Sequence, residues 1–343
     1  MGVDLADLVQ KKEINLNDLA GKTIAVDAYN AIYQFLTIIR GKSGEPLMDR
    51  QGRVTSHLSG LFYRITNLSE RGIRLAYVFD GDAPSQKEAE IRRRSKMKDE
   101  AQIKYEKAIE FGDLEEARVQ AQATSRMKDF MVEDSRRLLD ALGVPWMNAP
   151  SEGEAQAAYI ASRGDVWAAS SQDYDSLLFG APRLVRNLSI SGRRKLPRRN
   201  TYVEVEPEIV ELSQVIQQLA ISREQLVDLG ILVGTDYNPD GVKGVGPKTA
   251  LKLLKERESL DNIDQTIKES LPANLQEIRE LFLNPKVTSD YRLEWREPEI
   301  DSTVQFLCRE RDFSEERVRK ALERMIAGLK ETTKKTTLES FFG

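Results

Sequence analysis

The chain has 343 residues, of which 40% are hydrophobic and 31% charged, and its formal net charge is −4 at pH 7. This composition predicts a globular protein with a large core in one or two domains, and no apolar run approaches the roughly 18 to 20 residues of a membrane span. A single Cys308 excludes an internal disulfide and a cysteine zinc site, and a single His57 argues against histidine metal sites and Ser-His triads. The start of the chain lacks the pattern of a signal peptide, so we expect a cytoplasmic protein, or a nuclear one in a eukaryote.

Short apolar runs alternate with helical patterns through the first 240 residues. Strands are predicted at 23–27, 75–80, 166–171 and 183–187. Helices are predicted between them, at 29–40, 55–71, 134–142 and 152–162. This alternation predicts an α/β fold with a mostly parallel central sheet flanked by helices. From about residue 220 onward the pattern is mainly helical.

Residues 84–130 interrupt this alternation. They are rich in Lys, Arg, Glu and Gln and contain few large apolar residues, which predicts a projecting helical insertion rather than part of the core. Two stretches, 92–98 and 193–199, are strongly basic although the chain is acidic. A local basic surface can bind phosphates even when the net charge is negative.

Acidic residues stand where the predicted strands end. Asp27 closes the first strand, Asp80 closes the second, and Asp173 and Asp175 follow the third. Ligand crevices of open α/β sheets lie outside the carboxyl ends of the strands, and carboxylates gathered there need a hard cation among them. Taken singly, the first two can be helix caps and the last two can belong to a turn. The period-2 spacing of the last pair places both on one side of an extended segment.

Three further acids, Glu152, Glu154 and Asp236, extend this set. Ser151 and Glu154 also have the spacing of a capping box, which explains them equally well, and Asp236 can be a helix-ending residue. Seven acids in five segments are nevertheless improbable as independent caps. Such a set suits two divalent ions that activate a water and stabilise the leaving oxygen of a phosphodiester. Mg²⁺ fits because it prefers oxygen ligands and retains several waters.

Five stretches of the sequence carry a resemblance to a known family; they are 25–36, 77–81, 149–157, 171–180 and 234–237. On these stretches the chain resembles the flap endonucleases, structure-specific 5′ nucleases of replication and repair, and looks more archaeal than eukaryotic. The resemblance implies a PIN-like 5′ nuclease fold in one nuclease domain, 1–330, followed by a flexible tail, 331–343. The expected parts of that domain are an α/β core (1–83 and 131–240), a helical arch (84–130), a helix–hairpin–helix-like element (220–257) and a helical C-terminal part (258–330).

The resemblance also implies an activity and its cofactors. The expected reaction is hydrolysis of DNA near the junction of a 5′ flap with duplex, with an associated 5′–3′ exonuclease, in Okazaki fragment maturation and base excision repair. Two Mg²⁺ ions are expected, with Mn²⁺ as a substitute, in a monomer without a membrane partner. The implied metal ligands are Asp27, Asp80, Glu152, Glu154, Asp173, Asp175 and Asp236, of which Asp27, Asp80, Glu152 and Asp175 are also counted as catalytic. The alternatives are a related nuclease acting on bubbles or Holliday junctions, and a non-enzymatic DNA-binding scaffold.

Three more residues match positions of that family. Lys87 and Arg94 match its cationic gateway to the active site, and their spacing of seven places them on one face of a helix. Tyr33 matches a tyrosine that stacks on a base beside the scissile phosphate, which needs no sequence readout. Without the resemblance, the two cations fit a solvated helix face and the tyrosine fits a helix core.

A glycine-rich segment at 241–254 has some features of a phosphate-binding P-loop. Pro247 separates Gly246 from Lys248, however, and no strand precedes the segment, so a glycine hairpin between two helices is the better interpretation. Its backbone amides can hold a duplex phosphate without reading bases. The resemblance implies K⁺ on its carbonyls, although the chain has one extra residue before Gly244. The expected DNA contacts here are Gly234, Asp236, Lys243, Gly244, Gly246 and Lys248, with Glu152 from the acidic set.

The last residues of the chain resemble a peptide that docks on sliding clamps. Leu338, Phe341 and Phe342 would form one apolar plug on a helical turn. Lys335 stands where that motif usually has glutamine. We therefore expect the sliding clamp as a protein partner.

Overall fold

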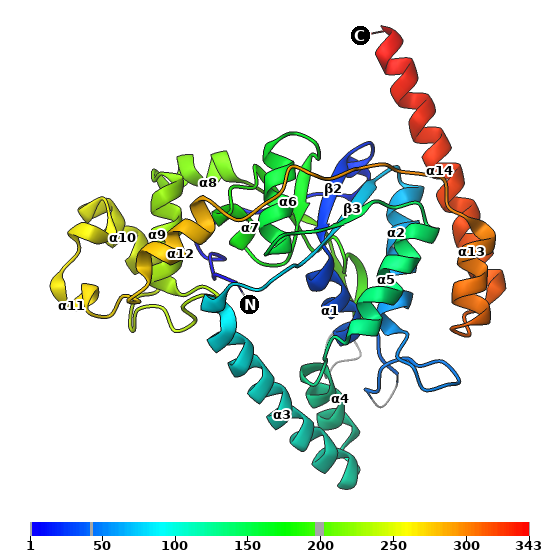
Figure 1. Ribbon diagram of the computed structural model, residues 1–343, viewed down its shortest axis with the longest axis horizontal. Coiled ribbons are helices and arrows are strands. Elements are labelled where there is room, and N and C mark those ends of the chain that lie inside the picture. Colours follow the sequence, from blue (N-terminus) through cyan, green and yellow to red (C-terminus); the bar gives the residue numbers. More distant parts are fainter. Residues whose placement is uncertain (1, 42–43, 196–201, 343) are drawn as a thin grey trace.

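The computed structural model describes residues 2–41, 44–195 and 202–342, and within these ranges the side chains of 193–195, of 202 and of 332 onward are not described. A seven-stranded sheet forms the centre (Figure 1). Its strands, in spatial order, are β1 (Lys12–Glu13), β9 (Glu208–Glu211), β6 (Arg183–Arg186), β5 (Ala168–Ser170), β2 (Thr23–Asp27), β3 (Arg74–Phe79) and β4 (Trp146–Asn148). The five strands from β6 to β4 are parallel, and β9 and β1 add an antiparallel edge.

The mostly parallel sheet predicted from the sequence is confirmed, with strand ends shifted by up to two residues. β1, β4 and β9 were not predicted, because runs of two to four residues give too short an alternation to recognise. The same holds for the antiparallel pair formed by β7 (Gly192–Lys195) and β8 (Tyr202–Val205).

Helices cover both faces of the sheet. One layer contains α1 (Ala28–Ile38), α2 (Ser56–Glu70), α5 (Asp129–Ala141), α13 (Ile300–Val304) with the π-helical η4 (Gln305–Arg309), and α14 (Glu315–Phe342). The other contains α6 (Gly153–Ser162), α7 (Asp175–Leu178), α8 (Leu212–Leu219), α9 (Arg223–Val233), α10 (Pro247–Arg257) and α12 (Leu275–Leu283). Short helices form η1 (Leu16–Leu19), η3 (Leu260–Asn262) and α11 (Gln265–Lys268).

Strand alternation decides on which side of the sheet the acids emerge. Ile24 and Val26 of β2 pack in the α1–α2 layer, whereas Ala25 packs in the α6 layer. In β3, Val78 likewise packs in the α6 layer. Side chains two residues apart share a face, so Asp27 and the residue after β3 continue toward the α6 side.

The segment 84–130 forms a pair of helices that projects from the body (Figure 1). It begins with η2 (Ser85–Lys87) and continues as α3 (Glu88–Glu110) and α4 (Leu114–Ala123). The two helices contact each other, and their buried apolar side chains are small: Ala101, Ala108, Ala117 and Ala121. An alanine interface explains why the sequence shows helices here without a stripe of large apolar residues.

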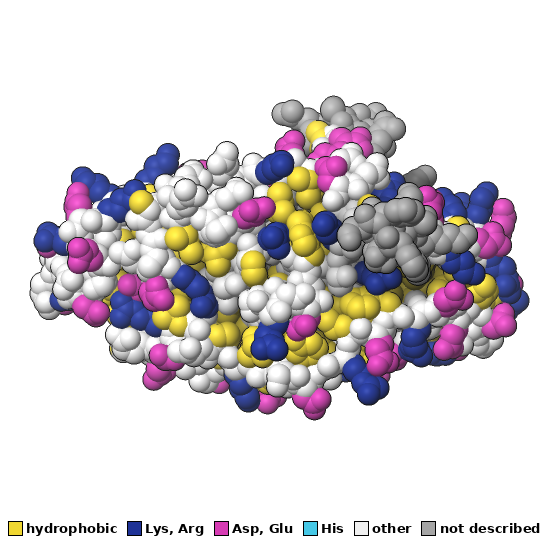
Figure 2. All heavy atoms as spheres, turned by 90° about the horizontal axis from the view of Figure 1, so that it is seen from above, with side chains coloured by type: hydrophobic (Ala, Val, Ile, Leu, Met, Phe, Trp, Pro, Cys, Tyr) yellow, Lys and Arg dark blue, Asp and Glu magenta, His cyan; other side chains and the backbone are white. Residues whose placement is uncertain are grey.

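On the side of the molecule away from α3 and α4, the described residues show no concentration of one charge. Figure 2 shows this side, on which basic and acidic side chains are interspersed around exposed hydrophobic ones. Within the described ranges, every helix is too short or too polar to cross a bilayer.

Candidate active site

Asp27 and Asp80 lie side by side at the carboxyl end of the sheet. Asp27 ends β2 and also caps α1, because its Oδ1 accepts a hydrogen bond from the Asn30 amide at 3.0 Å. Asp80 follows β3, and its Oδ1 accepts from the Gly153 amide at 2.6 Å. The cap interpretation is therefore correct for Asp27 without removing it from the site.

Glu152 and Glu154 flank the first residue of α6. Glu152 is the N-cap residue, and its side chain makes no capping hydrogen bond. The Ser151 hydroxyl instead donates to the Asp82 carbonyl at 3.1 Å, so the capping-box interpretation is wrong. Glu154 lies in the first turn, where its Oε1 is 3.5 Å from the Ser176 hydroxyl. Both glutamates thus remain available to a site.

The extended segment predicted from the spacing of Asp173 and Asp175 is wrong, and the alternative interpretation, a turn after the strand, is confirmed. The intervening Tyr174 has helical dihedrals (φ −79°, ψ −4°), and Asp175 opens α7. The start of the chain binds both carboxylates: the Gly2 amide donates to Asp173 Oδ1 at 3.1 Å, and the Val3 amide donates to Asp175 Oδ1 at 2.7 Å. Two backbone donors therefore anchor the pair.

The buried carboxylates raise one another's pKa. Burial, reinforced by Asp173, raises the pKa of Asp175 to about 7, and burial with Glu152 raises that of Asp80 to about 6. Burial and acidic neighbours also raise the pKa of Asp27 and Glu154 well above their ordinary values. Ionising all of these groups at neutral pH therefore requires positive charge among them.

The base of the arch supplies such charge. Lys87 Nζ lies 2.7 Å from Glu152 Oε2 and 3.3 Å from Asp236 Oδ2, and the Arg94 guanidinium donates to Asp236. Burial alone would lower the pKa of Lys87, but the two carboxylates outweigh it and raise that pKa. The two cations predicted to share a helix face thus meet at one carboxylate.

The donor set fits a hard divalent cation, since it consists of carboxylate oxygens that need a positive partner. Within the part of the chain that the structure describes, no three Asp, Glu, His or Cys side chains converge on one ion position. The carboxylates are instead engaged by two cationic side chains, Lys87 and Arg94, and by four backbone amides, those of Gly2, Val3, Asn30 and Gly153.

Tyr33 lies on α1 beside the arch. Its side chain is half-buried, and Lys98 Nζ of α3 lies 4.8 Å from the centre of its ring. This distance is that of a cation–π contact. The ring therefore faces the arch instead of being enclosed in the helix core.

The glycine hairpin joins α9 to α10. Gly234 ends α9 at φ 115°, and Gly246 is the N-cap residue of α10, followed by Pro247 at the first helical position. The residues expected to contact a duplex at its tip are all exposed: Lys243, Gly244, Gly246 and Lys248. The hairpin thus presents a helix N-terminus and two lysines to solvent.

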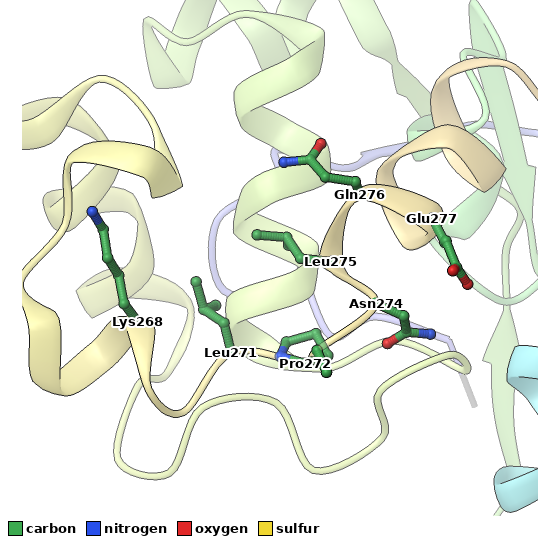
Figure 3. Close-up of a pocket in the computed structure, with 8 residues that line it drawn as sticks. Lys268, Leu271, Pro272, Asn274, Leu275, Gln276 and Glu277 are labelled. Atoms are coloured by element: carbon green, nitrogen blue, oxygen red, sulfur yellow. The ribbon is translucent and has the colours of Figure 1, made fainter.

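A hollow of about 400 Å³ lies elsewhere, along the link between α11 and α12 (Figure 3). Its lining contains none of the seven acids and consists of Lys268, Leu271, Pro272, Ala273, Asn274, Leu275, Gln276 and Glu277. The arch touches its rim, because Gln86 Nε2 donates to Glu277 Oε2 at 2.9 Å.

Sequence reasoning missed four residues of this region: Gly2, Val3, Glu90 and Lys98. The two amides reach acids more than 170 positions away, which no local pattern reports. Glu90 and Lys98 stand in a charged helix, where they resemble solvated residues. The residues expected to bind a sliding clamp, at 335–342, lie outside the side chains that the structure describes.

Known proteins share this sequence and fold. The chain matches the XPG N-terminal domain over residues 1–101 and the XPG I-region over 143–236. It is 57% identical to flap endonuclease 1 of Hyperthermus butylicus, covering 95% of this chain and 94% of that protein. It is 53% identical to flap endonuclease 1 of Pyrococcus furiosus, covering 100% and 99%.

Solved structures of related nucleases have the same fold as this chain. Flap endonuclease-1 from Methanococcus jannaschii superimposes with a TM-score of 0.77 at 41% identity, covering 96% of this chain and 99% of that chain. The catalytic core of Rad2 in complex with a DNA substrate has the same fold, with a TM-score of 0.71 at 24% identity, covering 95% and 100%. The resemblance seen in the sequence is thereby confirmed, and the chain belongs to the flap endonuclease 1 family of nucleases.

Proposed function

We propose that the chain is a structure-specific 5′ flap endonuclease with 5′–3′ exonuclease activity, acting in Okazaki fragment maturation and base excision repair. The observation that supports this most directly is the meeting of Lys87 and Arg94 with Glu152 and Asp236. One site thereby combines a ligand set for hard cations with side chains that bind phosphate.

Two Mg²⁺ ions, with Mn²⁺ as a substitute, would activate a water and stabilise the leaving oxygen of the phosphodiester when bound. The residues that would hold them are Asp27, Asp80, Glu152, Glu154, Asp173, Asp175 and Asp236. Lys87 and Arg94 would then contact the scissile phosphate and stabilise the charge that develops on it. Hydrogen bonds from the Asn30 and Gly153 amides hold the carboxylates of Asp27 and Asp80 in place.

DNA would bind at three places around the acids. Tyr33 would stack on the base next to the scissile phosphate, which requires Lys98 to leave its ring. The exposed hairpin would hold a duplex phosphate on the amides at the start of α10, aided by Lys243 and Lys248. A K⁺ ion on the hairpin carbonyls would stabilise that phosphate contact.

The nuclease assignment is tested with three labelled substrates: a 5′-flap duplex, a bubble and a four-way junction, each with Mg²⁺ and with chelator. We expect cleavage near the flap junction that chelator abolishes. An intact flap under every divalent ion would overturn the proposal, and preferred cleavage of the four-way junction would assign the chain to another activity of the superfamily. Asp175→Ala should lose cleavage and keep flap binding.

The sliding clamp is proposed as a partner through residues 335–342, on the sequence motif of Leu338, Phe341 and Phe342. Deleting residues 335–343 should abolish stimulation of cleavage by the clamp and leave basal cleavage unchanged. A fall in basal cleavage would show that the tail supports the fold instead. Gel filtration of the intact chain checks the expected monomer.

A further inference from the structure

Glu90 is a buried charge in a helix that is otherwise exposed. Its residue exposure is 2%, although α3 projects from the body and buries few other residues. The nearby Glu88 also pairs with the arginine four residues later, since its carboxylate lies 3.1 Å from Arg92, but Glu88 is solvent-exposed. Burial of one glutamate among several needs a specific explanation, because a buried carboxylate is costly unless it is well paired.

The explanation lies in what Glu90 holds. Its Oε1 accepts from Arg94 Nε at 2.7 Å, and its Oε2 accepts from Arg93 Nε at 2.6 Å. Arg94 uses its Nε for Glu90 and a terminal nitrogen for Asp236, so its guanidinium is fixed between two carboxylates. A planar guanidinium held at two of its nitrogens by two different carboxylates has little freedom to rotate.

We propose that Glu90 is a positioning residue for flap cleavage, acting through Arg94. This inference rests on the proposed function. When a phosphate of the DNA replaces Asp236 as the partner of the terminal nitrogens of Arg94, Glu90 still accepts the hydrogen bond from Arg94 Nε. The guanidinium is thereby held in the orientation that contacts the reacting phosphate. Loss of that support leaves a long side chain free to turn into solvent, and misplacing a catalytic group can cost about 100-fold in rate.

The test is single-turnover cleavage of a 5′ flap by the full chain, with flap affinity measured in parallel. Glu90→Ala should lower the cleavage rate roughly 10- to 100-fold and change flap affinity by less than about threefold. Glu90→Gln keeps an oxygen that accepts from Arg94 and should recover part of the rate. The matched control is Glu88→Ala, which removes the same charge from the same turn and should cleave like the parent.

A double-variant cycle separates positioning from support of the helix. In an Arg94→Ala background, Glu90→Ala should lower the rate by less than about twofold, since the group it positions is gone. An equal loss in both backgrounds would overturn the inference, and so would parent-like cleavage by Glu90→Ala. If Glu90→Ala does not fold, the same double-variant cycle is made with Glu90→Gln, and an equal loss of rate in both backgrounds again overturns the inference. If the parent chain cleaves no flap, the proposed function and this inference are both overturned. If the parent cleaves the flap, the results with the Glu90 variants test this inference alone.

Discussion

Lys87 donates a hydrogen bond to Glu152 at 2.7 Å, and this contact joins the base of the arch to the start of α6. The same ammonium lies 3.3 Å from Asp236, in the loop that follows α9. A divalent ion bound by these carboxylates competes with Lys87 for them. Competition of this kind is reciprocal, so the ion weakens the hold of the acids on the arch and Lys87 weakens the binding of the ion.

Lys87→Ala should therefore have opposite effects on metal binding and on cleavage. Calorimetric titration with Ca²⁺ should show a roughly fivefold or larger gain in affinity, whereas flap cleavage in Mg²⁺ should fall about 100-fold. Lys104→Ala removes the same charge from an exposed position of α3 and serves as the control. Equal Ca²⁺ affinity in the parent and both variants would contradict the competition.

The pH dependence of stability should report the crowded carboxylates. The folded pKa of Asp175 is about 7 and that of Asp80 about 6, both above the ordinary value of 3.8. Their contribution to stability is therefore present below about pH 4 and is lost as the pH rises through 6 and 7. In chelator, the metal-free protein should lose stability over this window, and divalent ions should restore it.

Asp175→Asn isolates that effect, because the amide oxygen still accepts from Val3 but carries no charge. Chemical denaturation in chelator should show the variant gaining stability relative to the parent from pH 5 to pH 8, by roughly 2 to 3 kcal/mol. A stability difference that stays constant over this range would show that the carboxylate is not under electrostatic strain.

Much of the site could be predicted from the sequence, because the ends of apolar strands can be recognised from a few neighbouring residues. Asp27 and Asp80 could be placed at strand ends from apolar runs of five or six residues, and the parallel sheet follows from the helices between those runs. The sequence left open whether Asp173 and Asp175 lie on an extended segment or in a turn, because the amides that hold them come from the start of the chain. Contacts across such sequence distances depend on the assembled fold.

The arch illustrates the same limit. The spacing of Lys87 and Arg94 predicted a shared face, and both side chains do reach Asp236. Nothing in the sequence distinguished Glu90 from Glu88, because both are glutamates in a charged helix and both pair with an arginine of the next turn. The folded chain brings Arg93 and Arg94 onto the Glu90 carboxylate, whose side chain is 3% exposed, and leaves that of Glu88 64% exposed.

Tyr33 offers a direct test of base stacking. Tyr33→Phe keeps the ring and should cleave flaps within about twofold of the parent, whereas Tyr33→Ala should lose roughly 10-fold, as for removal of one stacked base. A fluorescent 2-aminopurine next to the scissile phosphate should be quenched by the parent and by the Phe variant. Quenching that survives in Tyr33→Ala would show that another side chain receives the base.

Alanine substitutions at two glycines of the hairpin should show separately how much the backbone conformation contributes to stability and how much the backbone contributes to phosphate binding. Gly244 has φ 81° and Gly246 has φ −88°, and a Cβ at either would meet no atom within 4 Å. Gly244→Ala should therefore destabilise the protein by about 1 to 2 kcal/mol through its left-handed backbone. Gly246→Ala should cost less, below about 1 kcal/mol, because its backbone suits any residue and only the preference of the N-cap for glycine over alanine is lost.

For DNA binding, we expect the larger effect from the substitution at Gly246. Gly246 is the N-cap of α10, and a methyl group there stands where a phosphate would approach the amides of the first turn. Gly246→Ala should weaken binding of plain duplex severalfold, by fluorescence anisotropy, and leave affinity for a single strand unchanged. Duplex binding equal to that of the parent would place the phosphate contact on Lys243 and Lys248 rather than on the backbone.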